Sequence, residues 1–425
     1  MRCVYILHDY RVRAGGDQRK GEAMSHVVVI GAGQAGAALV ARLRSGGHAG
    51  PVTLIGAEPL LPYQRPPLSK GYLLGQTGAD RLTLRSADFY GEHDIALRLG
   101  TPVSAIDPQA RTVFLESGTI RYDDLVLATG AVPRRLPAAI GGDLAGVYTL
   151  RSVADVDGMR AEFRPARRLV IVGGGYIGLE VAAVAAGLGL DVTVLEMAPR
   201  ILQRVAAPET SDYFRALHVA HGVNILESTG LDRLSARAGR VTAARLTDGR
   251  EIPADFVIAG VGILPDTRLA EAAGLVIDNG IRTDAHGRTS DPQIWAAGDC
   301  ASFPWQGGRL RLESVQNAID QAEVVADNIL GAGKDYVPMP WFWSDQYDCK
   351  LQIAGLNSGY DRIVTRGPDG AAVSFWYFRG DRLLAVDAMN DSRAYMVGKR
   401  LLETGRSPDP AALRDPATNL KSLLA

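Results

Sequence analysis

The chain has 425 residues, of which 47% are hydrophobic and 22% are charged, and its net charge is −1. This length and composition are typical of a globular protein of about three domains, and the near-neutral charge does not favour nucleic acid or an anionic membrane as a partner. The three cysteines, Cys3, Cys300 and Cys349, form no closely spaced pair, which argues against a disulfide framework, a structural zinc site and a redox-active dithiol.

The first 23 residues differ in composition from the rest of the chain. Arg11–Lys20 is polar and basic, and the apolar run Val4–Leu7 is too short for the core of a secretory signal. We predict that residues 1–23 are a disordered extension ahead of Met24. In the absence of an export signal, a cytoplasmic location is expected.

The first unit is predicted to begin with a strand, a glycine-rich turn and a helix. The apolar run Val27–Ile30 leads into Gly31-Ala32-Gly33-Gln34-Ala35-Gly36, and a helix is expected from Gln34 to about Ser45. In such a motif Gly31 permits the tight turn, Gly33 admits a pyrophosphate to the backbone, and Gly36 allows close helix–strand packing. The helix N-terminus then offers free N–H groups to the phosphates. This pattern predicts a dinucleotide site.

Several residues that follow are candidates for further contacts with this first cofactor. After the next strand, Val52–Ile55, Glu58 stands close to the place of the acid that binds an adenosine ribose. Two adjacent prolines in Pro66-Pro67-Leu68-Ser69-Lys70 stiffen the backbone and fix the position of Lys70. Two later buried strands end in small turns, at Thr129-Gly130 and at Gly298-Asp299.

A second fingerprint repeats the pattern. The strand Leu169–Val172 leads into Gly173-Gly174-Gly175-Tyr176-Ile177-Gly178, in which Gly173, Gly175 and Gly178 take the three glycine roles. A helix is predicted over Tyr176–Leu188, and the strand after it is Asp191–Leu195. Two dinucleotide sites in one polypeptide indicate that electrons pass between the two cofactors.

Glu196 indicates which nucleotide binds at the second site. It ends the strand at the spacing expected for the acid that accepts hydrogen bonds from both ribose hydroxyls. A carboxylate there repels a 2′-phosphate, and the nearest arginines, Arg200 and Arg204, do not follow at once. NADH is therefore favoured over NADPH. The chain leaves this unit through Ala254–Pro265, which contains the candidate contact Gly262.

The histidines give little support for metal chemistry. The seven histidines form no His-Glu-x-x-His cluster, although His218 and His221 can share a helix face. We interpret this pair as partly exposed helix residues, and no metal site is predicted.

Beyond about Gly331 the sequence changes again. Trp341–Tyr347 is dense in aromatic residues, the apolar runs Val373–Phe378 and Leu383–Val386 flank a predicted hairpin turn, and Ala394–Thr404 is predicted to be helical. These patterns indicate a small α+β domain.

Four strings taken together are specific: Pro66–Lys70, Gly173–Glu180, Glu313–Ala318 and Trp341–Tyr347. On these strings the chain from Met24 onward resembles the oxygenase-coupled ferredoxin reductases, of the putidaredoxin reductase and rubredoxin reductase kind. Disulfide reductases of similar architecture carry cysteines just ahead of the lysine segment, and this chain has none there. Electrons must therefore go to an outside acceptor.

The resemblance implies an α/β fold with two Rossmann-like dinucleotide-binding domains and a C-terminal α+β domain, as in glutathione-reductase-like flavoproteins. The FAD-binding domain is predicted to cover residues 24–145 and 262–332. The NAD-binding domain, 146–261, is inserted in it, and the C-terminal interface domain covers 333–425.

The resemblance also implies site residues. Family contacts to FAD carry over to Ala35, Lys70, Val103, Arg151, Asp299 and Val315, with Asp299 on the ribityl chain; Thr129 is a further candidate cofactor contact. Glu180 is expected to pair with Lys70 beside the reactive edge of the flavin, and Tyr176 to gate the entry of nicotinamide. The position at which the family has its ribose-binding aspartate is Ala57 in this chain, so Glu58 is the candidate for that contact.

The function implied is an NADH-dependent ferredoxin reductase: NADH reduces FAD, and single electrons pass to a [2Fe–2S] ferredoxin that feeds a haem monooxygenase or a ring-hydroxylating dioxygenase. The alternatives are reduction of rubredoxin or another acceptor, and a redox-sensing flavoprotein of the apoptosis-inducing-factor type. Trp343 either lines the electron exit or walls off the nicotinamide pocket. Arg65, Arg309 and Arg311 are candidate contacts for an acidic ferredoxin, and the oligomeric state stays open.

Overall fold

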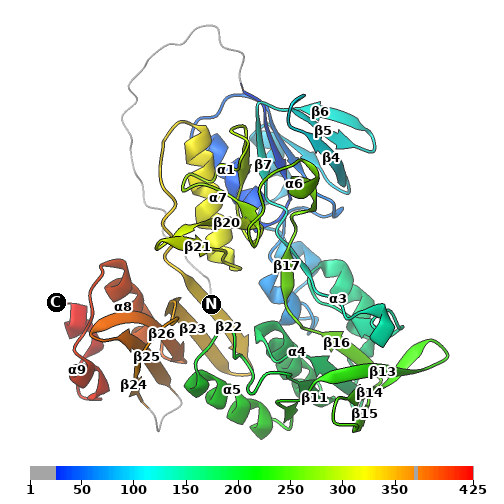
Figure 1. Ribbon diagram of the computed structural model, residues 1–425, viewed down its shortest axis with the longest axis vertical. Helices are drawn as coiled ribbons and strands as arrows, with labels where there is room; N and C mark the ends of the chain where they lie inside the picture. The colour runs from blue at the N-terminus through cyan, green and yellow to red at the C-terminus, as the bar shows by residue number, and fades with distance from the viewer. Residues whose placement is uncertain (1–24, 368–371, 425) are drawn as a thin grey trace.

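A computed structural model describes residues 25–367 and 372–424, so the predicted extension 1–23 lies outside the described residues. Three parts are visible, each built on a five-stranded sheet (Figure 1). The first part lies at the top of the view, and the second and third lie side by side below it. The α/β fold class predicted from the sequence is confirmed.

The first sheet is parallel, with the order β19-β7-β1-β2-β3. Its strands are β1 (Val27–Ile30), β2 (Val52–Ile55), β3 (Ile95–Arg98), β7 (Asp124–Leu127) and β19 (Ile294–Ala296). Helices α1 (Gln34–Ser45) and α7 (Val315–Ile329) pack against one face through the side of β1 that carries Val29. Val28 faces the opposite side, as strand alternation requires, and packs toward a small antiparallel sheet. That sheet consists of β4 (Val103–Asp107), β5 (Thr112–Leu115) and β6 (Gly118–Arg121).

The second sheet repeats this design, with the order β12-β11-β10-β16-β9. Its strands are β9 (Val147–Tyr148), β10 (Arg168–Val172), β11 (Asp191–Leu195), β12 (Asn224–Leu226) and β16 (Phe256–Ala259), and its helices are α3 (Val153–Met159), α4 (Tyr176–Gly187) and α5 (Pro208–Ala220). An antiparallel sheet of β13 (Leu231–Arg237), β14 (Arg240–Leu246) and β15 (Glu251–Pro253) packs on it. The chain leaves the first part through β8 (Ala131–Pro133) and returns through β17 (Ile263–Pro265), and these two strands pair with each other.

The third sheet is antiparallel, with the order β22-β23-β26-β25-β24. Its strands are β22 (Trp341–Gln346), β23 (Cys349–Gly355), β24 (Arg362–Arg366), β25 (Val373–Arg379) and β26 (Arg382–Met389). Helices α8 (Ser392–Glu403) and α9 (Pro410–Arg414) cover one face of it. The predicted hairpin is the β25–β26 pair, and the predicted helix is α8.

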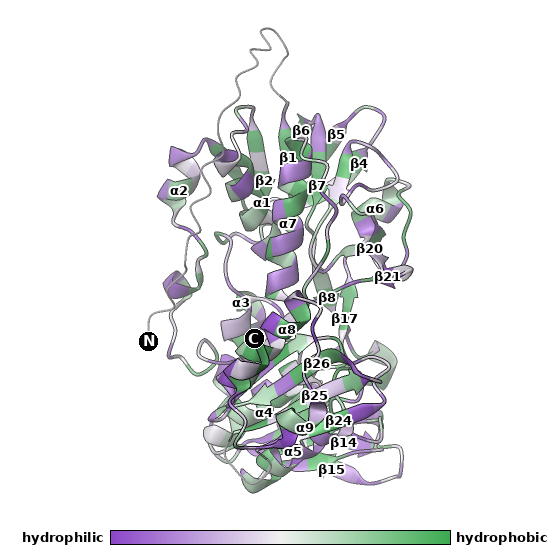
Figure 2. Cartoon of the chain, turned by 90° about the vertical axis from the view of Figure 1, so that its left-hand side faces the viewer, coloured by the Kyte–Doolittle hydropathy of each residue, from purple (hydrophilic) through white to green (hydrophobic). Residues whose placement is uncertain are grey.

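The remaining elements are short: α2 (Ala87–Glu92), α6 (Arg268–Ala272), β18 (Ile281–Arg282), β20 (Ala301–Trp305), β21 (Gly308–Leu310), η1 (Pro66–Ser69), η2 (Ala79–Leu82), η3 (Ala138–Ile140), η4 (Arg160–Glu162) and η5 (Leu420–Leu424). Figure 2 shows apolar residues concentrated on the sheet strands, whereas α7 carries polar residues on its outer face. Within the described ranges, no helix combines the length and apolar character that a bilayer crossing requires.

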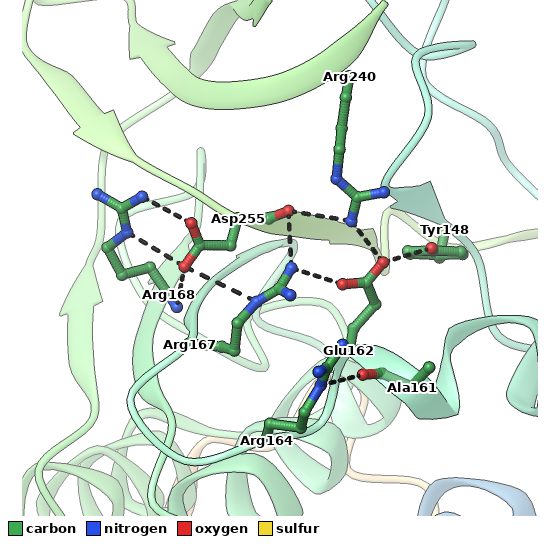
Figure 3. Close-up of polar contacts among 8 residues, drawn as sticks. All are labelled: Tyr148, Ala161, Glu162, Arg164, Arg167, Arg168, Arg240 and Asp255. Atoms are coloured by element: carbon green, nitrogen blue, oxygen red, sulfur yellow. Dashed lines mark hydrogen bonds and ion pairs between the residues drawn. The ribbon is translucent and has the colours of Figure 1, made fainter.

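An ionic cluster around the buried Glu162 joins the antiparallel sheet β13–β15 to the second sheet (Figure 3). The Glu162 carboxylate accepts hydrogen bonds from Tyr148 Oη at 2.9 Å and from the guanidinium groups of Arg167 and Arg240, both at 2.5 Å. Burial opposes ionisation of Glu162, but the bonds from Arg240 and Tyr148 and the charge of Arg167 outweigh it, so its pKa lies below the ordinary value. The cluster lies away from both glycine fingerprints and is a structural contact.

Candidate functional site

A cavity of about 830 Å³ opens where the first sheet, α4 and β22 meet. Its size is in the range of cofactor sites. The sequence-predicted site residues that line it are Gly31, Gly33, Ala35, Glu58, Lys70, Val103, Thr129, Arg151, Tyr176, Glu180, Asp299, Val315 and Trp343. These positions are spread over most of the chain, and the fold brings them to one place.

The first fingerprint forms one wall of this cavity. Gly31 has φ +118°, and a side chain there would collide with the carbonyl oxygen of Ala128. Around Gly33, no described atom lies within 4 Å of the place where a Cβ would stand. No described side chain caps α1, and its first turn holds no acid, so the positive end of the helix faces the cavity uncompensated. This wall fits the pyrophosphate of a dinucleotide.

The Glu58 carboxylate is already engaged by its neighbours. Glu58 Oε2 accepts a hydrogen bond from Tyr63 Oη at 2.6 Å, and Oε1 pairs with Arg65 Nη2 at 2.7 Å. Arg65 also donates to the backbone oxygen of Arg151 at 2.7 Å. The acid is therefore fixed at the cavity wall, next to Ala57. Each of its two oxygens has one partner and keeps a second lone pair that can accept a hydrogen bond from a ligand.

Arg151 and Asp299 form an ion pair across the cavity wall. Arg151 Nη2 lies 2.9 Å from Asp299 Oδ2, and both side chains are mostly buried. Asp299 follows β19, and Arg151 precedes α3, so the pair joins the first part to the second. A carboxylate held in this way keeps one oxygen free for a hydroxyl-rich chain such as the ribityl group.

Lys70 and Glu180 form a largely buried ion pair in the cavity wall. Lys70 Nζ lies 2.6 Å from Glu180 Oε2, with side-chain exposures of 20% and 5%. Glu180 Oε2 also accepts from Ser69 Oγ at 2.5 Å, and Oε1 accepts from Ser344 Oγ at 2.7 Å. The carboxylate is therefore fully engaged, and it holds the ammonium group at the cavity surface.

Aromatic rings close this end of the cavity. The Tyr176 ring packs against Phe342, with ring centroids 4.8 Å apart, and Phe342 is followed on β22 by Trp343. The Tyr176 hydroxyl is hidden from solvent and finds no partner among the described residues. Burial raises its pKa well above the ordinary value, and the negative charges of Asp387 and Glu180 act in the same direction. Tyr176 is therefore a neutral ring in the cavity wall.

The glycines of the second fingerprint lie outside this cavity, at the start of α4. Gly173 has φ +109°, and a side chain there would collide with the Gly260 carbonyl oxygen. Glu196 stands beside it: Oε2 accepts from the Gly174 amide and Oε1 from the Ala198 amide, both at 2.8 Å. The backbone thus orients the carboxylate next to the glycine turn. The predicted residues that do not line the main cavity are Gly36, Gly173, Gly175, Gly178, Glu196 and Gly262.

Comparisons with known proteins agree with this geometry. The family model "Pyridine nucleotide-disulphide oxidoreductase" matches residues 25–322, and the model "Reductase C-terminal" matches 341–424. The chain belongs to the pyridine nucleotide-disulphide oxidoreductase family. It is an FAD-dependent oxidoreductase, as the sequence predicted.

Individual relatives cover nearly the whole chain. A ferredoxin–NAD(P)(+) reductase from a Sphingomonas species is 45% identical over 94% of this chain and 97% of its own length. Rhodocoxin reductase from Rhodococcus erythropolis is 43% identical over 94% of each. The solved putidaredoxin reductase–putidaredoxin complex is similar with a TM-score of 0.91 and 41% identity, over 95% of this chain and 99% of that one.

Sequence reasoning missed two hydroxyl groups of this oxidoreductase. Ser69 and Ser344 hold Glu180, but serines carry no pattern that marks a contact between residues so far apart in the chain. The interpretation of His218 as partly exposed is wrong: it is fully buried and bonded to Gln346 Oε1 at 2.8 Å. His221, in contrast, is exposed at the end of α5. Across the described residues, no three His, Cys, Asp or Glu side chains gather in a metal-binding arrangement.

Proposed function

We propose that this protein is an NADH-dependent ferredoxin reductase that passes electrons from NADH through FAD to a [2Fe–2S] ferredoxin. The observation that carries the proposal is the Lys70–Glu180 pair in a cavity that has no cysteine among its described lining residues. This lining offers no thiol relay beside the flavin, which supports transfer of the electrons to an outside acceptor. Relatives that match nearly the full chain, among them a ferredoxin reductase, support this acceptor.

FAD fits the main cavity, and when bound it supplies the conversion of hydride transfer into single-electron transfer. The α1 N-terminus and Gly33 would hold its pyrophosphate, and Glu58, Arg151 and Asp299 its sugar hydroxyls. Lys70 would supply a positive charge to stabilise the negative charge of the reduced ring. Tyr176 and Trp343, which line the cavity, would wall off the nicotinamide pocket.

NADH is the proposed donor because the Glu196 carboxylate lies beside the second glycine turn, where it would repel a 2′-phosphate. Its carboxylate is held by two backbone amides, so it is not free to turn away from an incoming phosphate. The residue ranges assigned above to FAD-binding, NAD-binding and interface domains are part of this proposal. A cytoplasmic location fits it, since NADH is available there.

The three arginines considered as ferredoxin contacts are engaged within the protein. Arg65 pairs with Glu58, Arg311 pairs with Glu313 at 2.5 Å, and Arg309 donates to the backbone oxygen of Thr283 at 2.8 Å. They do not form a free basic patch.

The decisive test is a panel of purified acceptors under saturating NADH: a [2Fe–2S] ferredoxin, a rubredoxin and dioxygen, with cytochrome c reporting ferredoxin reduction. Turnover is expected to be fastest with the ferredoxin. Faster reduction of rubredoxin or dioxygen would replace the acceptor in this proposal. A purified protein that is colourless and does not bind added FAD would contradict the proposal as a whole.

A further inference from the structure

A chain of buried polar side chains ends on the Glu180 carboxylate. Ser344 Oγ lies 2.7 Å from Glu180 Oε1, Gln346 Nε2 lies 3.1 Å from Ser344 Oγ, and His218 Nε2 lies 2.8 Å from Gln346 Oε1. Tyr347 Oη lies 3.1 Å from His218 Nδ1. Ser344, Gln346 and His218 are at most 1% exposed. Such a run of polar groups in a core is costly unless every member is paired, and here the pairing is complete along the chain.

The donor and acceptor chemistry gives every link the same direction. An ionised Glu180 paired with Lys70 only accepts, so Ser344 donates its hydroxyl proton to it. The Ser344 oxygen then accepts from the Gln346 amide nitrogen, and the Gln346 carbonyl accepts from the Nε2–H of His218. His218 Nδ1 must in turn accept from the Tyr347 hydroxyl. Every N–H and O–H bond in the chain therefore points toward Glu180.

This order requires a neutral His218, because an imidazolium would donate its Nδ1–H to the Tyr347 oxygen and so reverse the last link. Burial, together with the nearby His221, lowers the pKa of His218 to about 4, although the bond to Gln346 opposes this. The ring is therefore neutral throughout the physiological range. The geometry, rather than a titration, defines its role.

We propose that His218 is a positioning residue: through Gln346 and Ser344 it fixes the orientation of the Glu180 carboxylate, and through Glu180 the place of the Lys70 ammonium in the cavity. The inference rests on the proposed function, in which Lys70 lies beside a flavin. His218 itself does not line the cavity. The chain is not a route for protons, since the Gln346 amide does not release one under these conditions.

The test compares two substitutions of His218 in the flavin-loaded enzyme. His218→Gln keeps an Nε2–H that can donate to Gln346, while His218→Phe keeps the ring shape and removes the donor. Anaerobic stopped-flow absorbance gives the rate of flavin reduction and the dissociation constant of NADH. Equilibration with a reference dye gives the relative stability of the reduced flavin.

His218→Phe is expected to slow flavin reduction about threefold to tenfold with the NADH dissociation constant unchanged. The dye equilibrium should shift about threefold toward oxidised flavin, because less of the Glu180 charge is compensated. His218→Gln should stay within about twofold of the parent in both the flavin reduction rate and the dye equilibrium. If His218 acts by packing alone, Phe will be the milder change, and that order would overturn the proposal. His221→Phe, on the exposed side of Tyr347, serves as the matched control.

A double-mutant cycle tests whether the effect of His218 on the flavin reduction rate is transmitted through the hydrogen bonds of Gln346 and Ser344. In a Ser344→Ala background the link to Glu180 is absent, so His218→Phe should have no further effect on the flavin reduction rate. If His218→Phe slows flavin reduction by the same factor in both backgrounds, His218 does not act on Glu180 through Ser344, and the proposal is wrong. Should His218→Phe not fold, Gln346→Met takes its place with the same expectation. None of these readouts uses a ferredoxin, so they separate this inference from the choice of acceptor, and loss of FAD binding in the parent would instead refute the proposed function.

Discussion

Lys70 Nζ and Glu180 Oε2 lie 2.6 Å apart, although the lysine follows η1 beside the first sheet and the glutamate lies on α4 of the second. Removing one partner of such a buried pair leaves an uncompensated charge. The pair therefore fixes both the electrostatics of the cavity and the relative position of the two sheets.

Lys70→Met is expected to slow flavin reduction by NADH on the order of 100-fold, the effect of losing a positioned charge that stabilises the reduced ring. Stopped-flow absorbance of the flavin measures this directly. Lys399→Met is the matched control. Lys399 is on α8, where it lies over the Trp341 ring, and it does not line the cavity. An unchanged reduction rate in Lys70→Met would remove the role assigned to this lysine.

Glu196→Gln is expected to lower the preference for NADH over NADPH at least about tenfold, which corresponds to about 1.4 kcal/mol. The physical reason is that repulsion of a 2′-phosphate is lost. The ratio of kcat/KM values for the two nucleotides is the measurement. Asp191→Asn, at the opposite end of the same strand β11, should leave the ratio unchanged. Equal use of both nucleotides by the parent protein would refute the ribose argument.

Glu162→Gln is expected to destabilise the fold by about 1–3 kcal/mol at pH 7, because Arg167 and Arg240 lose a charged acceptor. The pKa of Glu162 is lowered by folding, so its contribution is present above the ordinary value of 4.5 and is lost as the pH falls below it. Denaturant unfolding of the two proteins across this pH range should give curves that converge in acid. The exposed Glu251→Gln on β15 is the control, and a gap that persists undiminished in acid would contradict the assignment.

Asp387 should show the opposite pH dependence. This fully buried acid on β26 accepts from Thr210 Oγ1 at 2.7 Å and from Tyr377 Oη at 2.8 Å, and burial raises its pKa to about 6 against these two bonds. Its protonated form is favoured in the folded state, so its contribution is complete below pH 3.8 and is lost as the pH rises through 6. Relative to Asp387→Asn, the parent should therefore gain stability between pH 7 and pH 4, by up to about 3 kcal/mol.

Denaturant unfolding at several pH values measures this difference. Asp381→Asn, in the exposed turn between β25 and β26, is the control and should show no such trend. A difference that is flat across the range would mean that Asp387 is already protonated at pH 7 or is solvated in the folded state.

The sequence predicted the elements whose physical cause is local. Val27–Ile30 and Leu169–Val172 are continuous apolar runs that become central parallel strands, and the helix Gln34–Ser45 follows from the glycine turn before it. The residues gathered in the main cavity were largely predictable too, because the fingerprints and the strings around Lys70 and Trp343 carry them.

What sequence did not reveal depends on contacts between distant segments. Ser344 looks like any serine in a strand until the fold places it against Glu180, 164 positions away in the chain. His218 was misjudged for the same reason: its helix has one exposed face, and only β22 determines that this histidine is covered. Register and packing between parts set these contacts, and periodicity within one element does not contain them.

The antiparallel pairing of β8 with β17 has a consequence for how such enzymes diversify. Because the outgoing and returning segments run side by side, the backbone of residues 134–262 joins the first part at one place, like an inserted cassette. A change of pyridine nucleotide preference can thus be acquired by exchanging that cassette, which also carries Arg151, Tyr176 and Glu180 of the main cavity. The exchange succeeds only if the new cassette keeps these three side chains, because Ser69 and Lys70 of the first part and Ser344 of the third bind the Glu180 carboxylate.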